Sequence, residues 1–305
     1  MKTTKSPAAV LAVAHLIGES SLALFGHRFS PKKFTQPQLF ACLVLKEFMQ
    51  FDYRKLAALL GDAEELCGLI QLKAVPHFTT FQKAAQRLLK TGQVRRLLRS
   101  SLECARSGGH LGSRVDLAAL DGTGFESRHA SAYYLERREK GRESREKRRP
   151  ARHPRYPKAG IVCDTKSHLI LAVVPDQGPG SDQRHYREAI DQARANIPIN
   201  TLTADAGYDS EASHTYARST HKMRTLIPPT IGRPTSRPPT GYWRRQMKSR
   251  LHLTRYSQRW QVETVNSMIK RLLGSALRAR SYWSRCREIL LRALTLNTMI
   301  IAQPP

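Results

Sequence analysis

The amino-acid sequence predicts an α/β fold, in which a mixed β-sheet with flanking helices is preceded by a helical N-terminal domain. Up to about residue 108 the apolar residues recur at helical spacing. The segment Ser107-Gly-Gly-His110 breaks this pattern, and short β-rich runs then alternate with helical segments. At 305 residues the chain can bury a substantial core. We therefore expect a helical domain over residues 1–108 and an α/β domain over residues 109–305.

The N-terminal region is expected to contain several short helices. We interpret Pro7–Gly18 as the first helix and not as a signal peptide, because it contains His15 and runs into an amphipathic pattern. Later helices are predicted over Gln36–Phe48, over Tyr53–Leu60 with a stop at Gly61, and over Gln82–Leu89 after a capped turn at Val75–Phe81. Because the last of them is basic, the arrangement is typical of a helix-turn-helix unit or of a bundle that packs against the rest of the chain.

The second region is expected to begin with a strand over Val115–Leu120 that ends at Asp121. The next elements, in order, are hairpin strands Ala159–Cys163 and Leu169–Pro175, a helix Gln183–Asn196 capped by Ser181-Asp182, a strand Asn200–Ala204, a helix Glu211–Ser219 and a strand Arg224–Ile227. A proline-rich insert at residues 228–250, without regular structure as far as Gly241, leads to a helix over about residues 254–273 and a last helix over about 283–302. This order is that of a ribonuclease H-like domain.

The composition favours a polyanionic partner. The net charge is +27, from 51 Lys and Arg against 24 Asp and Glu, and phosphates neutralised by such cations release counterions and strengthen binding. A ribosomal or membrane-surface protein fits less well, because 40% of the residues are hydrophobic and the periodic segments are long. A basic segment at residues 128–158 carries twelve Lys or Arg against four Glu, which suits either phosphate binding or a solvated loop.

Neither a membrane span nor a zinc site is expected. No apolar run approaches the length that crosses a bilayer. The five cysteines are scattered, odd in number and without zinc-ligand spacing, which is typical of buried thiols in a reducing compartment. We therefore expect a cytoplasmic, nucleoid-associated protein.

Three acidic residues are candidate metal ligands. Asp121 and Asp205 each follow an apolar strand, and Glu263 lies on a patterned helix. Acids at strand ends stand where sheets commonly place ligand-binding groups, although Asp also caps turns. If the three converge at one end of a sheet, they suit Mg²⁺ or Mn²⁺, and two such ions can activate the attacking oxygen and stabilise the leaving one in phosphodiester chemistry.

The helix that carries Glu263 presents further functional groups. Tyr256, Arg259, Glu263 and Lys270, spaced at 3, 4 and 7 residues, fall on one narrow stripe of a helix. The opposite side is apolar and consists of Val262, Val265, Met268, Ile269, Leu272 and Leu273. Such a helix can pack on a scaffold with its back and hold a metal ion and a phosphate with its front.

These motifs resemble a known family. The pattern Tyr256-x2-Arg259-x3-Glu263-x6-Lys270 is similar to the signature of the IS4-type DDE transposases of bacterial insertion sequences. Asp121-Gly-Thr-Gly-Phe125 resembles their first catalytic block, and Ala204-Asp205-Ala-Gly-Tyr208-Asp209 resembles their second. The resemblance extends from about residue 112 to the end of the chain.

The resemblance implies an activity and a set of roles. Asp121, Asp205 and Glu263 would bind two Mg²⁺ or Mn²⁺ ions, and Tyr256, Arg259 and Lys270 would contact phosphates near the scissile bond. The implied partners are double-stranded DNA, as terminal inverted repeats and as target, and a second copy of the chain in a homodimer. The implied reaction is hydrolysis at the ends of the element, followed by attack of the freed 3′-hydroxyl on target DNA. A ribonuclease H-like nuclease without strand transfer, and a catalytically inactive DNA-binding copy, remain as alternatives.

Several further residues carry expectations of their own. Gly122 stands where the family often has a hydroxyl residue, and the insert before the last functional helix is shorter than in many relatives. Trp243 and Trp260 are candidates for stacking on a flipped base, although packing is the favoured interpretation for Trp260. Lys158 flanks the hairpin and is a candidate DNA contact. We expect Asp209 to cap the helix that begins near Glu211, and Asp164 to belong to the hairpin turn.

Overall fold

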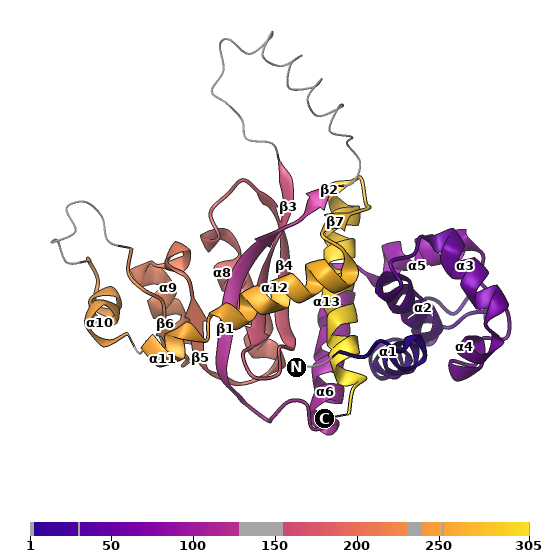
Figure 1. The fold of residues 1–305 in the computed structure, drawn as a ribbon, viewed down its shortest axis with the longest axis horizontal. Coiled ribbons are helices and arrows are strands. Elements are labelled where there is room, and N and C mark those ends of the chain that lie inside the picture. Colours follow the sequence, from indigo (N-terminus) through magenta and orange to yellow (C-terminus); the bar gives the residue numbers. More distant parts are fainter. Residues whose placement is uncertain (1–2, 30, 128–154, 231–238, 252, 305) are drawn as a thin grey trace, which may run out of the picture.

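The centre of the molecule is a five-stranded mixed sheet, seen here in a computed structural model that describes residues 3–29, 31–127, 155–230, 239–251 and 253–304. The strand order is β4-β3-β1-β5-β6 (Figure 1). The strands are β1 (Val115–Gly124), β3 (Tyr156–Asp164), β4 (Ile170–Gly178), β5 (Ile199–Ala204) and β6 (Arg224–Leu226). β3 runs antiparallel to both of its neighbours, β4 and β1, whereas β5 and β6 are parallel to β1. The expected mixed α/β architecture is confirmed, and it is compatible with a ribonuclease H-like domain.

Helices cover both faces of this sheet. α12 (Trp260–Leu273) packs on β1 and β3, and α8 (Gln183–Asn196) packs on β3 and β4. Successive strand residues point to opposite faces, and on β1 Asp121 contacts α12 while the backbone of Gly122 faces Asp182, just before α8. The two helices therefore lie on opposite sides of the sheet. The last helix, α13 (Tyr282–Ile301), also packs on β3 and β4.

The N-terminal part of the chain is helical, as expected. Its helices are α1 (Pro7–Ser21), α2 (Gln36–Phe48), α3 (Tyr53–Asp62), α4 (Glu64–Leu69), α5 (Phe78–Leu88) and α6 (Thr91–Ser107). In Figure 1, α1–α5 lie on the side of α13 away from β5 and β6. α13 packs on α2 and α6 as well as on the sheet, so one continuous apolar core extends from Val10 to Ile301. The division at residue 108 therefore stays a prediction.

A buried ion cluster joins α2 to α13. Arg292 contacts Glu47 at 2.9 Å and Glu288 at 3.0 Å, and Lys46 contacts Glu47 at 2.9 Å. All four side chains are at most 11% exposed. Each charge has a partner of opposite sign, and Arg292 makes several hydrogen bonds. These contacts offset the cost of removing the charges from water, and they fix how the two helices meet.

Several predicted elements differ from the structure, among them the helix expected from Gln82, which begins at Phe78 as part of α5. β1 continues to Gly124, so Asp121 lies inside the strand, and α3 continues through Gly61 to Asp62. The expected helix over residues 254–273 is divided into α11 (Leu253–Ser257) and α12 by a tight turn at Gln258–Arg259. There the amide of Arg259 bonds the carbonyl of Tyr256, three residues back instead of four. Helix α10 (Tyr242–Arg250), at the end of the insert, was not predicted.

Some expectations lie outside the described residues, namely most of the basic segment, at 128–154, and residues 231–238 of the proline-rich insert. In the part of the chain that the structure describes, no helix combines the length and apolar character needed for a membrane span.

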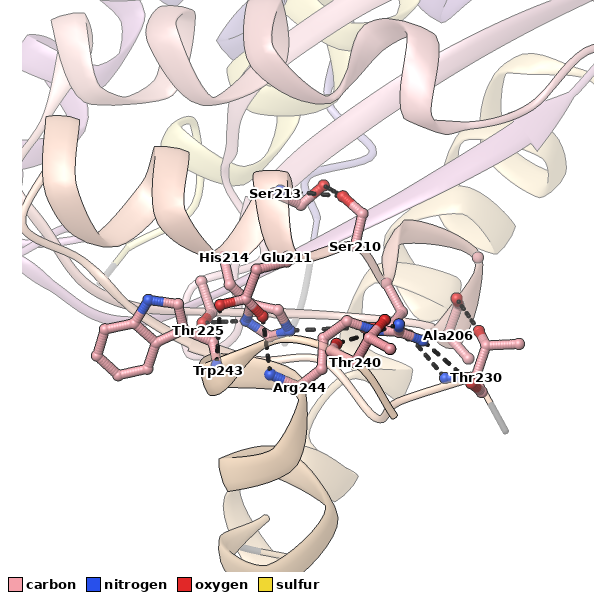
Figure 2. Close-up of polar contacts among 12 residues, drawn as sticks. Ala206, Ser210, Glu211, Ser213, His214, Thr225, Thr230, Thr240, Trp243 and Arg244 are labelled. Atoms are coloured by element: carbon pink, nitrogen blue, oxygen red, sulfur yellow. Dashed lines mark hydrogen bonds and ion pairs between the residues drawn. The ribbon is translucent and has the colours of Figure 1, made fainter. Parts of the chain in front are cut away.

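Helix α10 is held by two carboxylates of the segment after β5 (Figure 2). Glu211 accepts hydrogen bonds from the amides of Trp243 and Arg244, at 3.1 and 3.2 Å, and so caps the first turn of α10. Arg244 donates to both oxygens of Asp209 at 2.7–3.0 Å, and the Asp209 side chain is fully buried. The expectation that Asp209 caps the following helix is wrong, because Ser210 accepts that bond from Ser213. Asp164 lies in the hairpin turn, as expected, where it accepts from Ser167.

We predict that Arg244→Ala lowers the free energy of unfolding by about 3 kcal/mol, because the substitution leaves the Asp209 carboxylate buried without its ion-pair partner. Chemical denaturation followed by circular dichroism measures the change. Arg245→Ala is the matched control, since among the described residues the Arg245 guanidinium bonds only the carbonyl of Gly241, just before the same helix. Equal stabilities for the two variants would show that the Asp209–Arg244 pair does not hold α10.

Candidate active site

Two of the predicted acids lie side by side because of the register between two strands. β1 and β5 are parallel, and Leu120 pairs with Ala204. Asp121 follows Leu120 and Asp205 follows Ala204. The backbones of the two acids therefore lie about 5 Å apart, which is the usual spacing between neighbouring strands. The strand pairing thus brings together two acids that are 84 residues apart in the sequence.

The third acid reaches the same end of the sheet on α12. The apolar back of this helix is buried as predicted, through Val262, Val265, Met268, Ile269 and Leu273, with Leu272 partly buried. Asn266 fixes the helix over β1, because its Nδ2 donates to Oδ2 of Asp121 at 3.1 Å. Glu263 lies one turn before Asn266 and is about half exposed, at 53%.

Each acid is held by a donor from its own neighbourhood. Asp205 Oδ1 accepts from the Gly207 amide at 2.9 Å, Glu263 Oε1 contacts the Arg259 guanidinium at 2.6 Å, and Asp121 accepts from Asn266. Among the described residues, no three Asp, Glu, His or Cys side chains are gathered closely enough to enclose a metal ion.

The electrostatics nevertheless couple the three acids. Burial, together with the negative charges of Asp205 and Glu263, raises the pKa of Asp121 from 3.8 to about 6, against opposing effects of the Gly122 amide and of Arg259. Both other acids therefore act on Asp121 through space. A raised carboxyl pKa in a cluster of acids is typical of a site that takes up a cation.

Comparison with known proteins identifies the family of this site. A family model described as the transposase DDE domain matches residues 114–298, which is more than half of the chain. The chain belongs to this family. A comparison with curated proteins found no match. Transposases with a DDE domain act on DNA and generally use divalent metal ions.

The residues present in this DDE domain fit such an ion. Three carboxylates supply hard oxygen donors, and burial together with the charges of Asp205 and Glu263 raises the pKa of Asp121 despite the nearby Arg259. Mg²⁺ and Mn²⁺ prefer such ligands and would remove the excess charge.

Asn266 is a residue of the DDE domain that our sequence analysis missed. It is 6% exposed, its Nδ2 binds Asp121, and its Oδ1 is buried without a hydrogen-bond partner among the described residues. A buried acceptor without a partner is costly, so its presence beside an acid indicates a functional constraint. The available signal was weak, because Asn266 lies at the edge of the apolar back of α12, and Ser267 is a second polar residue between Val265 and Met268.

Tyr256, Arg259 and Lys270, the other residues of the signature, each have different neighbours. The turn at Gln258–Arg259 changes the helical phase, and Tyr256 packs against an apolar cluster of Leu117, Leu226 and Met247. Arg259 ion-pairs with Glu263, one turn along. The Lys270 ammonium lies 5.9 Å from the centre of the Phe125 ring. Their predicted phosphate contacts stay predictions.

The two tryptophans named as stacking candidates have different surroundings. Trp260 is 51% exposed, so the interpretation that it packs in the protein is wrong. Trp243 is already engaged, because the Arg218 guanidinium lies 4.1 Å from the centre of its ring.

Lys158 and Gly122 both lie against Asp182 on the second face of the sheet. Lys158 is buried, ion-pairs with Asp182 and donates to the carbonyl of Gly180 at 3.3 Å, so a DNA contact would require this pair to open. A Cβ at position 122 would lie 2.7 Å from Asp182 Oδ1 and 3.1 Å from Lys158 Cε. A side chain at position 122 would therefore meet this ion pair, and glycine leaves the space that the pair occupies.

We predict that Asp121→Asn stabilises the metal-free protein at pH 7.5 by about 1–3 kcal/mol, because an amide does not carry the charge that the site disfavours. The pKa of Asp121 is raised from 3.8 to about 6, so between these values the folded state binds more protons than the unfolded state. Stability therefore falls as the pH rises through this window.

The advantage of the variant should accordingly shrink toward zero below about pH 4. Urea denaturation in EDTA at pH 4 and pH 7.5 measures it. A difference between the two proteins that does not change with pH would contradict the assigned environment of Asp121.

Proposed function

We propose that this protein is the transposase of an IS4-like insertion sequence, which binds the terminal inverted repeats, cleaves DNA at the element ends and joins the 3′-hydroxyl ends to target DNA. The observation that carries the proposal is the placement of Asp121 beside Asp205, beneath a helix that carries Glu263. The match to the DDE domain and the net charge of +27 support it.

In this proposal Asp121, Asp205 and Glu263 hold two Mg²⁺ or Mn²⁺ ions. When bound, such ions activate the attacking oxygen and stabilise the leaving oxygen of a phosphodiester. Asn266 holds the Asp121 carboxyl group in its orientation, and the extended backbone at Asp205, with the Gly207 amide, holds the second. The buried back of α12 keeps Glu263 at the same end of the sheet.

Arg259 is the residue best placed to bind the phosphate. Its guanidinium is 24% exposed, beside Glu263 and within electrostatic reach of Asp121. A planar guanidinium can donate two parallel hydrogen bonds to a phosphate, which fixes orientation as well as charge. Lys270, farther along α12, would add a point charge. Tyr256 would position Arg259 from the preceding turn.

The helical N-terminal part and a second copy of the chain complete the proposal. Two DNA ends must be held together for joining, which requires a dimer or larger assembly on DNA. Helices α3–α5 present basic residues such as Lys83 and Arg87 and are candidates for contact with the inverted repeat.

Two other functions are distinguished by simple assays. A ribonuclease H-like nuclease would cut the element ends but would not join a pre-cut 3′-hydroxyl end to target DNA. An inactive DNA-binding copy would bind the ends but would not nick them in Mn²⁺. The presence of all three acids, with Arg259 and Lys270, favours the active enzyme.

We predict that Glu263→Gln abolishes metal-dependent cleavage while DNA binding stays within a few fold, because the amide keeps the shape but loses the negative charge that holds a cation. Gel assays of nicking and binding on DNA from the element ends measure both. The matched control is Glu188→Gln, a half-exposed surface carboxylate on α8 paired with Arg95. A parallel loss of binding would argue against a metal-ligand role for Glu263.

We also predict that Arg259→Ala weakens DNA binding and reduces the slope of log Kobs against log salt by about one, the value for one lost phosphate contact. DNA-binding titrations at several salt concentrations measure the slope, and EDTA prevents metal-dependent cleavage during the measurement. Arg95→Ala on α6 serves as control. An unchanged slope in Arg259→Ala would remove this residue from the phosphate contacts.

A further inference from the structure

Two aromatic side chains are exposed where α13 begins. Tyr282 is 40% exposed and Trp283 is 68% exposed, and their rings lie 5.2 Å apart in an edge-on arrangement. Trp283 is the most exposed of the three tryptophans. Single exposed apolar residues are common, but a tryptophan with most of its surface in water suits contact with a partner.

Beside this pair lies an open groove of about 410 Å³, between helices α2, α3 and α5 and the start of α13. Its wall on the α13 side consists of Arg278, Arg280, Ser281, Ser284, Arg287 and Glu288. On α13, Arg287 follows Trp283 by four residues, so the two side chains are neighbours on the helix surface. The groove and the exposed indole therefore form one continuous surface.

The free charge of the groove is positive. Its three acids are already engaged, since Glu47 and Glu288 bind Arg292, and Asp52 caps α3 through the amides of Arg54 and Lys55. Arg280 and Arg287, by contrast, make no hydrogen bond or ion pair within the described ranges. Two guanidiniums beside an exposed indole are thus available to a ligand.

The backbone at this position is well ordered by its own contacts. The Glu288 carboxylate accepts from the amides of Arg278 and Ala279 at 2.9–3.0 Å. Ser281 caps α13 by accepting from the amide of Ser284, and Arg285 donates to the carbonyl of Ala279. A ligand would therefore meet a backbone that needs little further ordering, which favours affinity.

This surface lies at the same end of the sheet as the candidate active site. The Tyr282 hydroxyl is within electrostatic reach of Asp176. In the sheet, Asp176 pairs with Lys158, and Lys158 pairs with Gly124, three residues after Asp121 on β1. DNA bound at Asp121 can therefore continue toward the start of α13.

We propose that Arg280, Trp283 and Arg287, which we term the α13 platform, bind a DNA strand that leaves the active site, with phosphates on the two arginines and an unpaired base stacked on the indole. The proposal rests on the function proposed above, since the partner is the same DNA. Base stacking on aromatic side chains combined with basic residues is the usual mode of single-strand binding. Nothing in the match to the DDE domain assigns this role.

The first test measures the phosphate contacts. The probe is a short fluorescein-labelled duplex with a single-stranded tail, and anisotropy in EDTA is recorded over a series of salt concentrations. We expect the double variant Arg280→Gln, Arg287→Gln to reduce the salt slope by about two, because each lost phosphate contact contributes about 0.9. The control double variant, Arg95→Gln with Arg96→Gln on α6, should retain the full slope.

The second test measures stacking. In the variant Trp243→Phe, Trp260→Phe, Trp283 is the single tryptophan of the chain. We expect the tailed probe to quench its fluorescence at saturation, whereas the same duplex without a tail should not.

The outcomes separate the platform from the overall function. If the unsubstituted protein does not bind the probe, the proposed function itself fails. If it binds, and the arginine variant keeps the full slope or the Trp283 fluorescence does not respond to the tail, the platform is overturned while the function stands. Circular dichroism of each variant checks folding, since Arg287 and Trp243 are only partly exposed whereas Arg280 and Trp260 are exposed.

Discussion

The parallel pairing of β1 with β5 is the constraint on which the site depends. It sets Asp121 beside Asp205, and the raised pKa of Asp121 is the electrostatic consequence of burial and of the acids around it. Strand pairing and the apolar back of α12 supply the free energy that holds these groups together against their repulsion. The site is thus maintained by the fold and not by attraction among its own side chains.

The segment after β5 connects this site to the rest of the domain. Asp205 belongs to the site, and the Gly207 amide orients it. Tyr208 is buried, and its hydroxyl lies 2.8 Å from His185 of α8, which ties the segment to the second face of the sheet. Asp209 then holds α10, which leads into the helices that carry Arg259 and Glu263. Five consecutive residues, Asp205 to Asp209, therefore join the two faces of the sheet and the final helices.

The sequence predicted the elements that depend on periodicity and missed those that depend on tertiary partners. The sheet strands and the buried face of α12 followed from alternation and helical spacing. The break at Gln258–Arg259 did not, because nothing in these residues disfavours a helix, and only the packing of Tyr256 against Leu117 and its neighbours accompanies it. The buried position of Lys158 was missed for the same reason, since its partner Asp182 lies on another element. For Asn266, the sequence offered only the weak sign of a polar residue at the edge of the apolar face of α12.

The Arg259–Glu263 ion pair links the two halves of the proposed chemistry. The guanidinium contacts the carboxylate at 2.6 Å, and both groups are partly exposed. A cation held by Glu263 would weaken the attraction between these two side chains, because the carboxylate charge would then be shared. The guanidinium would become available to a phosphate. Metal binding and DNA binding are therefore expected to favour each other. The cation would replace Arg259 as the partner of Glu263, and the phosphate would replace Glu263 as the partner of Arg259.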